Sequence, residues 1–207
     1  MSYYRRSDFT PSEQWQTVDG EIGRNQDRYR LTFRRAGGQK IVNYHYDFSQ
    51  HPLRCLLAHY LLEGAEEFAG GSLNHKFRCM KLLEQFLSET GTEDLTPEIF
   101  LSFIRWLSEA KKPDGATKYG DSTIASVVNY TRMFYESGLQ QQHSGWNQRD
   151  LDLMTVTASK MLRGRSRRSL QESFDKAISH ASFSALVKAV AIEFAQCQQV
   201  MAERKAN

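Results

Sequence analysis

The segment from Ser72 to Leu139 constrains the fold most strongly, because three stretches within it repeat apolar residues at spacings of three and four. Such spacing puts the apolar side chains on one face of an α-helix, and that face must pack against another element. The segment therefore predicts three amphipathic helices that share a core. The three sets of apolar positions are Phe77, Met80, Leu83, Phe86 and Leu87; Ile99, Phe100, Phe103, Ile104 and Leu107; and Ile124, Val127, Val128, Thr131, Phe134 and Tyr135.

The limits of two of these helices are also marked in the sequence. Thr96 is a good N-cap, and Pro97 suits the first helical position, where its missing N–H costs nothing. Asp121 or Ser122 can cap the third helix, and Gly138 suits the left-handed residue that follows a helix. We therefore expect the second helix to begin at Pro97 and the third to end just before Gly138.

The N-terminal part of the chain has a different pattern. Residues 1–27 are polar without a regular period, so they are expected to be irregular, with Trp15 as a single apolar anchor. Residues 28–48 alternate apolar and polar side chains on both sides of a turn at 36–39, which predicts a β-hairpin. A two-stranded hairpin is only marginally stable alone, so it should pack on the helices that follow.

One more helix is expected before the three described above, from Pro52 to a stop near Gly64. This makes four helices in all before the polar residues 140–150, which predict a loop. A shorter helix is expected over 150–162. The apolar positions of the first helix are Leu53, Leu56, Leu57, Tyr60 and Leu61.

Four arginines then fall within six residues, separated by small side chains, at Arg163, Arg165, Arg167 and Arg168. Such a run cannot be buried, so it is expected to form a solvated linker. A last amphipathic helix follows over 181–204, and its apolar stripe requires a partner surface. That stripe consists of Phe183, Leu186, Val187, Val190, Phe194, Cys197 and Met201.

The composition excludes several classes of protein. The chain has 207 residues, 40% of them hydrophobic, and no apolar run approaches the roughly 20 residues of a membrane-spanning helix. The N-terminus lacks the apolar core of a secretory signal, and three widely separated cysteines indicate a reducing, cytoplasmic location. Cys55, Cys79 and Cys197 are expected to be buried thiols. No metal-ligand spacing and no phosphate-binding or nucleophile motif is present, so no metal, cofactor or small-molecule substrate is expected.

The ordered series of helices, loop, arginine run and terminal helix over residues 47–200 resembles the core-binding, SAM-like domain and linker of the tyrosine recombinase or phage integrase family. The resemblance implies a mainly α fold: an N-terminal β-hairpin, a four-helix SAM-like core-binding bundle and a C-terminal helical extension. It divides the chain into an N-terminal segment at 1–48, a helical core-binding domain at 49–139, a loop, short helix and basic linker at 140–180, and the first helix of a catalytic domain at 181–207.

The resemblance also implies a function. The chain would be the part of a site-specific recombinase that clamps double-stranded DNA during integration and recombination, located in the bacterial cytoplasm and at the nucleoid when bound. The family's catalytic series of Arg, Lys, His-x-x-Arg, His or Trp, and Tyr cannot be placed in order here. The spacing of His51 and Arg54 matches His-x-x-Arg, but a helix start with Pro52 in its first turn explains it better. The chain alone is therefore expected to be catalytically inert toward DNA.

Helical phase and the resemblance together predict the DNA contacts. A net charge of +3 favours a nucleic-acid partner only mildly, but cations are concentrated in and after the three-helix segment. The third helix should present Ser122, Ser126, Asn129 and Arg132 to a groove, with the backbone of Ser122 and Thr123 at a phosphate and with Lys118 and Tyr119 just before it. The resemblance adds the start of an earlier helix and the linker. These contribute Asn74, His75, Lys76 and Arg78, and Arg163, Arg165, Arg167 and Arg168.

Two other functions stay open from the sequence. A small helical protein with basic patches can be a protein-interaction module, in which case the stripe from Phe183 to Met201 would be a dimer or partner surface. The chain can also be a regulator that binds DNA without recombinase chemistry. Self-association on DNA is compatible with either DNA-binding hypothesis.

Overall fold

The computed structural model describes residues 9–35 and 40–161. The chain divides into two compact units, residues 1–164 and 165–207. The second unit lies outside the described residues, as do the predicted arginine linker from Arg163 to Arg168, the terminal helix and Cys197. The description below concerns the first unit.

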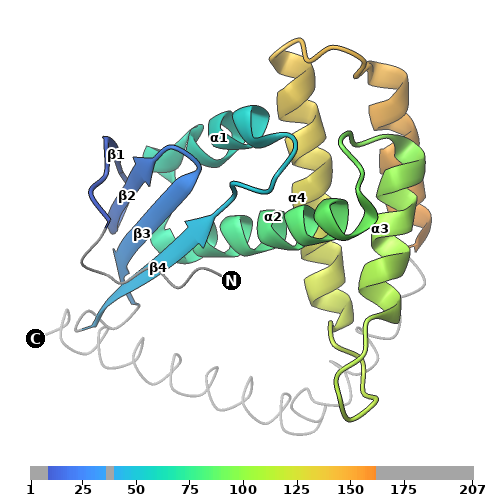
Figure 1. Ribbon diagram of the computed structural model, residues 1–207, viewed down its shortest axis with the longest axis horizontal. Coiled ribbons are helices and arrows are strands. Elements are labelled where there is room, and N and C mark those ends of the chain that lie inside the picture. The colour runs from blue at the N-terminus through green and yellow to red at the C-terminus, as the bar shows by residue number, and fades with distance from the viewer. Residues whose placement is uncertain (1–8, 36–39, 162–207) are drawn as a thin grey trace, which may run out of the picture. The chain divides into compact units, whose positions relative to one another are not determined.

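A four-stranded antiparallel sheet opens the fold (Figure 1), with strand order β1-β2-β3-β4. Its strands are β1 (Glu13–Gln16), β2 (Gly20–Asn25), β3 (Arg28–Arg34) and β4 (Ile41–Asp47). The predicted hairpin is present as β3 and β4, but within the described residues the prediction that residues 1–27 are irregular is wrong, because β1 and β2 lie there. Ile22 is the only buried aliphatic side chain of β2, so apolar and polar side chains alternate only weakly along this strand. Pairing with β3, rather than a sequence pattern, fixes β2 in the sheet.

The two faces of the sheet differ because side chains alternate along each strand. On β3 the buried side chains are Tyr29, Leu31 and Phe33, whereas the arginines and the threonine between them lie on the opposite face. The buried face packs against a helix, which comes closest at Gly70. A Cβ at Gly70 would lie 2.2 Å from the ring of Phe33, so only glycine allows this approach.

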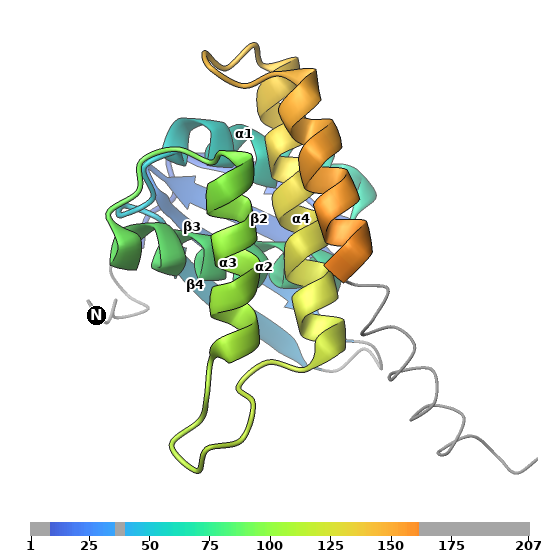
Figure 2. The same cartoon turned by 90° about the vertical axis from the view of Figure 1, so that its right-hand side faces the viewer.

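Within the described residues, five α-helices and a 3-10 turn follow the sheet. They are α1 (Arg54–Leu62), η2 (Ala65–Glu67), α2 (Gly70–Thr90), α3 (Pro97–Glu109), α4 (Asp121–Gln140) and a helix over residues 148–161. α2 lies against β3 and β4, and α4 crosses α2 on the side away from the sheet (Figures 1 and 2). α3, α4 and the helix over 148–161 run side by side (Figure 2). The mainly α class and the sheet-then-helices order are as predicted, with a larger sheet.

The three predicted helical stripes are confirmed as the core. Every member is buried except Ile99, which is partly buried and still packs against the core. The predicted start of α3 is also confirmed, because the side chain of Thr96 accepts a hydrogen bond from the N–H of Ile99 at 3.4 Å and Pro97 is the first helical residue. The loop after α4 and the short helix after it fall close to their predicted positions.

The end of α4 differs from the prediction. The helix continues to Gln140, and Gly138 lies inside it rather than past its end. Gly138 is buried against the indole of Trp146, which stacks on Tyr135 at a centroid distance of 4.2 Å. The Nε1–H of Trp146 also donates to Asp94 at 2.7 Å. This glycine therefore serves close packing of the indole, and it needs no left-handed conformation.

We predict that Gly138→Ala destabilises the fold by about 1 to 3 kcal/mol, although alanine is the better helix former. A Cβ at this position would lie 2.2 Å from Trp146, whose stacking and hydrogen bond prevent an easy shift. Urea unfolding followed by circular dichroism measures the change. Gly71→Ala in α2 is the matched control, because nothing lies within 4 Å of its Cβ position, and it should stabilise by up to about 1 kcal/mol. Equal effects of the two substitutions would contradict the packing role of Gly138.

Candidate nucleic-acid interface

The loop between α3 and α4 is held in a defined shape by its own backbone. The N–H of Lys112 donates to the carbonyl of Ala116 at 2.8 Å, and the N–H of Lys118 donates to the carbonyl of Ala110 at 2.9 Å. Gly115 has φ of +79°, a value that favours glycine, so the tight turn at the tip depends on it. Residues 110–120 therefore form a hairpin-like projection beyond the ends of α3 and α4 (Figure 2).

The α3–α4 loop carries unneutralised positive charge. Lys111, Lys112 and Lys118 are exposed, and none has a carboxylate within ion-pair distance in the described part of the chain. The loop's one acidic residue, Asp114, accepts a hydrogen bond from the N–H of Ala116 at 3.0 Å. The Nζ of Lys118 lies 5.3 Å from the centre of the Tyr119 ring. This surface can attract a polyanion without first breaking an ion pair.

The start of α4 adjoins these lysines. Its N-cap is Gly120, which has no side chain to cap the first N–H groups. Ser122 and Asn129 are exposed, and Thr123 and Ser126 are half-buried, so the predicted outer residues do lie away from the core. They form a short polar surface continuous in sequence with the basic loop.

Arg132 is less available than the prediction required. Its guanidinium makes an ion pair with Glu136, one helical turn later, at 3.3 Å, and its side chain is only 28% exposed. The Glu136 carboxylate therefore competes with any guanine or phosphate for this side chain. Helical phase alone places Arg132 on the outer face, but it does not include the attraction of a carboxylate four positions on.

The predicted DNA contacts on α2 differ in how available they are to a ligand. Arg78 is exposed and has no ion pair in the described residues. It lies close to Tyr46 of β4. Burial raises the pKa of the Tyr46 hydroxyl, and the charge of Arg78 opposes this shift. Asn74 accepts a hydrogen bond from the hydroxyl of Tyr46, and the ring of His75 meets that of Tyr130 at 5.6 Å. Arg78 is therefore the best DNA-contact candidate of this group.

The predicted role of Lys76 in DNA binding is wrong. The prediction put it at the DNA surface, but its side chain is buried, and its ammonium donates to the carbonyl of Tyr60. The Nζ also lies 4.0 Å from the centre of the Tyr60 ring. Burial lowers the pKa of Lys76 to about 8, with Glu63 opposing the shift. Lys76 therefore packs α2 against α1 and cannot reach a ligand outside.

His51 is buried at the start of α1 and has a local structural role. Its Nδ1 accepts the N–H of Leu53 at 3.0 Å, so the proton of the neutral ring lies on Nε2. Burial lowers the pKa of His51 to about 3, with a smaller contribution from Lys81. Pro52 lies in the turn just before α1 rather than in its first turn, because α1 begins at Arg54. Of the three cysteines predicted to be buried, Cys79 is buried, Cys55 is exposed and Cys197 lies outside the described residues.

The exposed cations fall into two groups. Most arginines of the sheet, together with Arg54 and Arg132, make ion pairs with nearby carboxylates. The cations without such a pair in ranges 9–35 and 40–161 are Arg34, Arg35, Lys40, Arg78, Arg105, Lys111, Lys112, Lys118, Arg149 and Lys160. The sequence separates the two groups only in part, because the pair of Arg132 is local in sequence whereas the others join different elements of the fold.

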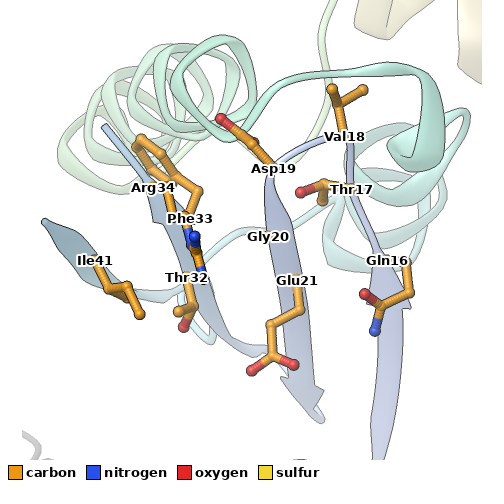
Figure 3. A pocket seen from close by; sticks show the side chains of 10 residues that line it. All are labelled: Gln16, Thr17, Val18, Asp19, Gly20, Glu21, Thr32, Phe33, Arg34 and Ile41. Carbon is orange, nitrogen blue, oxygen red and sulfur yellow. The ribbon is translucent and has the colours of Figure 1, made fainter. Parts of the chain in front are cut away.

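Neither of two depressions on the described surface has the residues of an active site. The one in Figure 3, of about 390 Å³, lies at an end of the sheet, with Gln16, Glu21 and Thr32 on adjacent strands. The other, of about 490 Å³, lies between Trp15 and α1. No group of three His, Cys, Asp or Glu in the described residues is placed to hold a metal ion. No helix there is both long and apolar enough to cross a membrane.

Comparisons with protein-family models, with curated proteins and with solved structures found no match for this chain.

Lys76→Met tests the structural role of this lysine. In the unfolded chain a lysine pKa is near 10.5, above the folded value of about 8, so the unfolded state binds more protons between these pH values. The wild type should therefore gain stability relative to Lys76→Met by roughly 2 kcal/mol as pH rises from 7 to 9.5. Urea unfolding at both pH values measures this difference. An unchanged difference would contradict the burial of the ammonium, and Arg78→Met on the exposed face of α2 is the control.

Proposed function

We propose that this chain binds double-stranded DNA through the α3–α4 loop and the start of α4. The observation that carries the proposal is the hydrogen-bonded loop with three exposed, unpaired lysines beside a helix N-terminus without a side-chain cap. Cations at the end of a helix suit phosphates, which are the main source of affinity in protein–DNA complexes. A fixed loop also loses less conformational entropy on binding than a mobile one.

In this proposal the loop and the helix have different tasks. Lys111, Lys112 and Lys118 contact phosphates and fix the position of the protein on the duplex. Ser122 and Asn129 then face a groove, where short polar side chains can bond to base edges. Arg132 has a smaller role than the sequence implied, because the ion pair with Glu136 must be broken first.

We further propose that the binding serves a site-specific recombinase of the tyrosine family. The support is the resemblance in the order of the helices and in the basic run that follows them. The strand cleavage and joining would belong to a catalytic domain outside this chain. The four linker arginines from Arg163 to Arg168 would add phosphate contacts, although they lie outside the described residues.

The triple variant Lys111→Ala, Lys112→Ala and Lys118→Ala tests the DNA-binding proposal. Each phosphate contact releases counterions, so the logarithm of affinity should depend less steeply on the logarithm of salt concentration, by roughly 0.9 per lost contact. Fluorescence anisotropy with a labelled duplex at several salt concentrations measures the slope. Because phosphates carry no base information, the loss should be similar for unrelated sequences.

The matched control is the triple variant Arg105→Ala, Arg149→Ala and Lys160→Ala. It removes the same charge from exposed, unpaired positions on α3 and on the helix over 148–161. The control should retain most of the wild-type salt slope. Absence of duplex binding by the wild-type chain at low salt, or equal losses in the two variants, would contradict the proposed interface.

A protein-interaction function is the second candidate. The helix over 148–161 exposes two large apolar side chains one turn apart, Leu153 at 50% and Val156 at 49%. Such a pair on an outer helix face is a small apolar surface that a protein partner can cover. This candidate becomes the better one if the wild-type chain does not bind duplex DNA.

A further inference from the structure

A second group of exposed cations lies at the turn end of the β3–β4 hairpin, where β3 ends and β4 begins. Arg34, Arg35 and Lys40 are exposed there, and none has an ion-pair partner within residues 9–35 and 40–161. The N–H of Arg35 donates to the carbonyl of Lys40 at 3.1 Å, which fixes the two strand ends to each other. The N–H of Arg34 donates to the carbonyl of Asp19 at 3.2 Å. The backbone beneath these three cations is therefore held in place.

The unpaired positive charge at this end does not extend along the rest of β3. Further along β3, Arg28 faces Asp47 at 3.8 Å and Arg30 faces Glu21 at 3.5 Å, both across adjacent strands. The same alternation continues to Arg34, whose cross-strand partner is Ile41, a side chain without charge. Among the described residues of the sheet, Arg24, Arg28 and Arg30 are neutralised by ion pairs, whereas Arg34 at the hairpin end is not.

The hairpin end and the α3–α4 loop extend on the same side of this unit. β4 begins at the lower edge in Figure 1, and the α3–α4 loop also reaches downward there. Figure 2, turned about the vertical axis, shows the same relation. Arg78, on α2, lies close to Tyr46 of β4. The two basic projections therefore extend toward the same side of this unit.

We propose that the hairpin end is a second phosphate contact, so that one DNA duplex lies across both projections. This inference rests on the proposed function and adds Arg34, Arg35 and Lys40 to it. Each cation can meet phosphate without first breaking an ion pair. The shallow depression beside Arg34 in Figure 3 lacks the enclosure of a small-molecule site, and a backbone contact needs none.

The triple variant Arg34→Ala, Arg35→Ala and Lys40→Ala tests this contact. Three lost phosphate contacts lower the salt slope by roughly 2.7, so the ratio of wild-type to variant affinity should fall roughly 40-fold between 50 and 200 mM salt. The double variant Arg34→Lys and Arg35→Lys keeps the charge and should bind nearly as the wild type does. Circular dichroism and thermal unfolding should show an unchanged fold, because the three side chains are exposed.

The outcomes separate this inference from the proposed function. If the α3–α4 loop variant weakens binding while the hairpin variant matches the Arg105, Arg149 and Lys160 control, the hairpin contact is overturned and the proposed function stands. If the wild type binds no duplex at low salt, both fail. If both variants weaken binding and flatten the salt slope beyond the control, both projections contact DNA.

Discussion

The burial of Phe77 of α2 against the aromatic side chains of the sheet is the interaction on which the rest of this structure depends. Its ring lies 5.3 Å from Tyr29, 5.1 Å from Tyr46 and 6.2 Å from Phe48, and Phe77 has no exposed surface. Aromatic contacts of this kind combine large buried area with preferred ring geometry. They fix α2 on the sheet, and α4 then packs on the other side of α2. Both proposed DNA projections take their positions from this arrangement, because one extends the sheet and the other extends α4.

Buried polar groups reinforce the same layer. Lys76 donates to the carbonyl of Tyr60, and Lys81 bonds both to the carbonyl of Asp47 and to the buried carboxylate of Glu84. Burial raises the pKa of Glu84, while the hydrogen bond from Lys81 lowers it. Lys76 is therefore an interior cation, whereas Lys81 reaches a buried carboxylate with a side chain that stays 43% exposed. Among the described exposed cations without an ion pair, Arg35, Lys40, Lys111, Lys112 and Lys118 lie in loops, whereas Arg78, Arg105, Arg149 and Lys160 lie on helices.

The helical part of the fold was predictable for a simple physical reason. Apolar residues at spacings of three and four, as at Phe77, Met80 and Leu83, specify both a helix and the face that it buries. The predicted contacts were less successful, because exposure and pairing are set by neighbours distant in sequence. The ion pair of Arg132 could have been anticipated from Glu136 four positions on. The burial of Lys76 against Tyr60 could not, since no local rule brings α1 to that point.

The sequence by itself determined the positions of the β3–β4 hairpin and of the helices, and the capped start of α3 at Thr96 and Pro97, since each follows from local periodicity or local capping. Tertiary structure alone decided that two further strands join the hairpin, that Gly138 sits within α4 beneath Trp146, and which cations remain unpaired. Strand pairing, close packing and charge compensation join residues far apart in the chain, and their outcome depends on distances that only the folded molecule establishes.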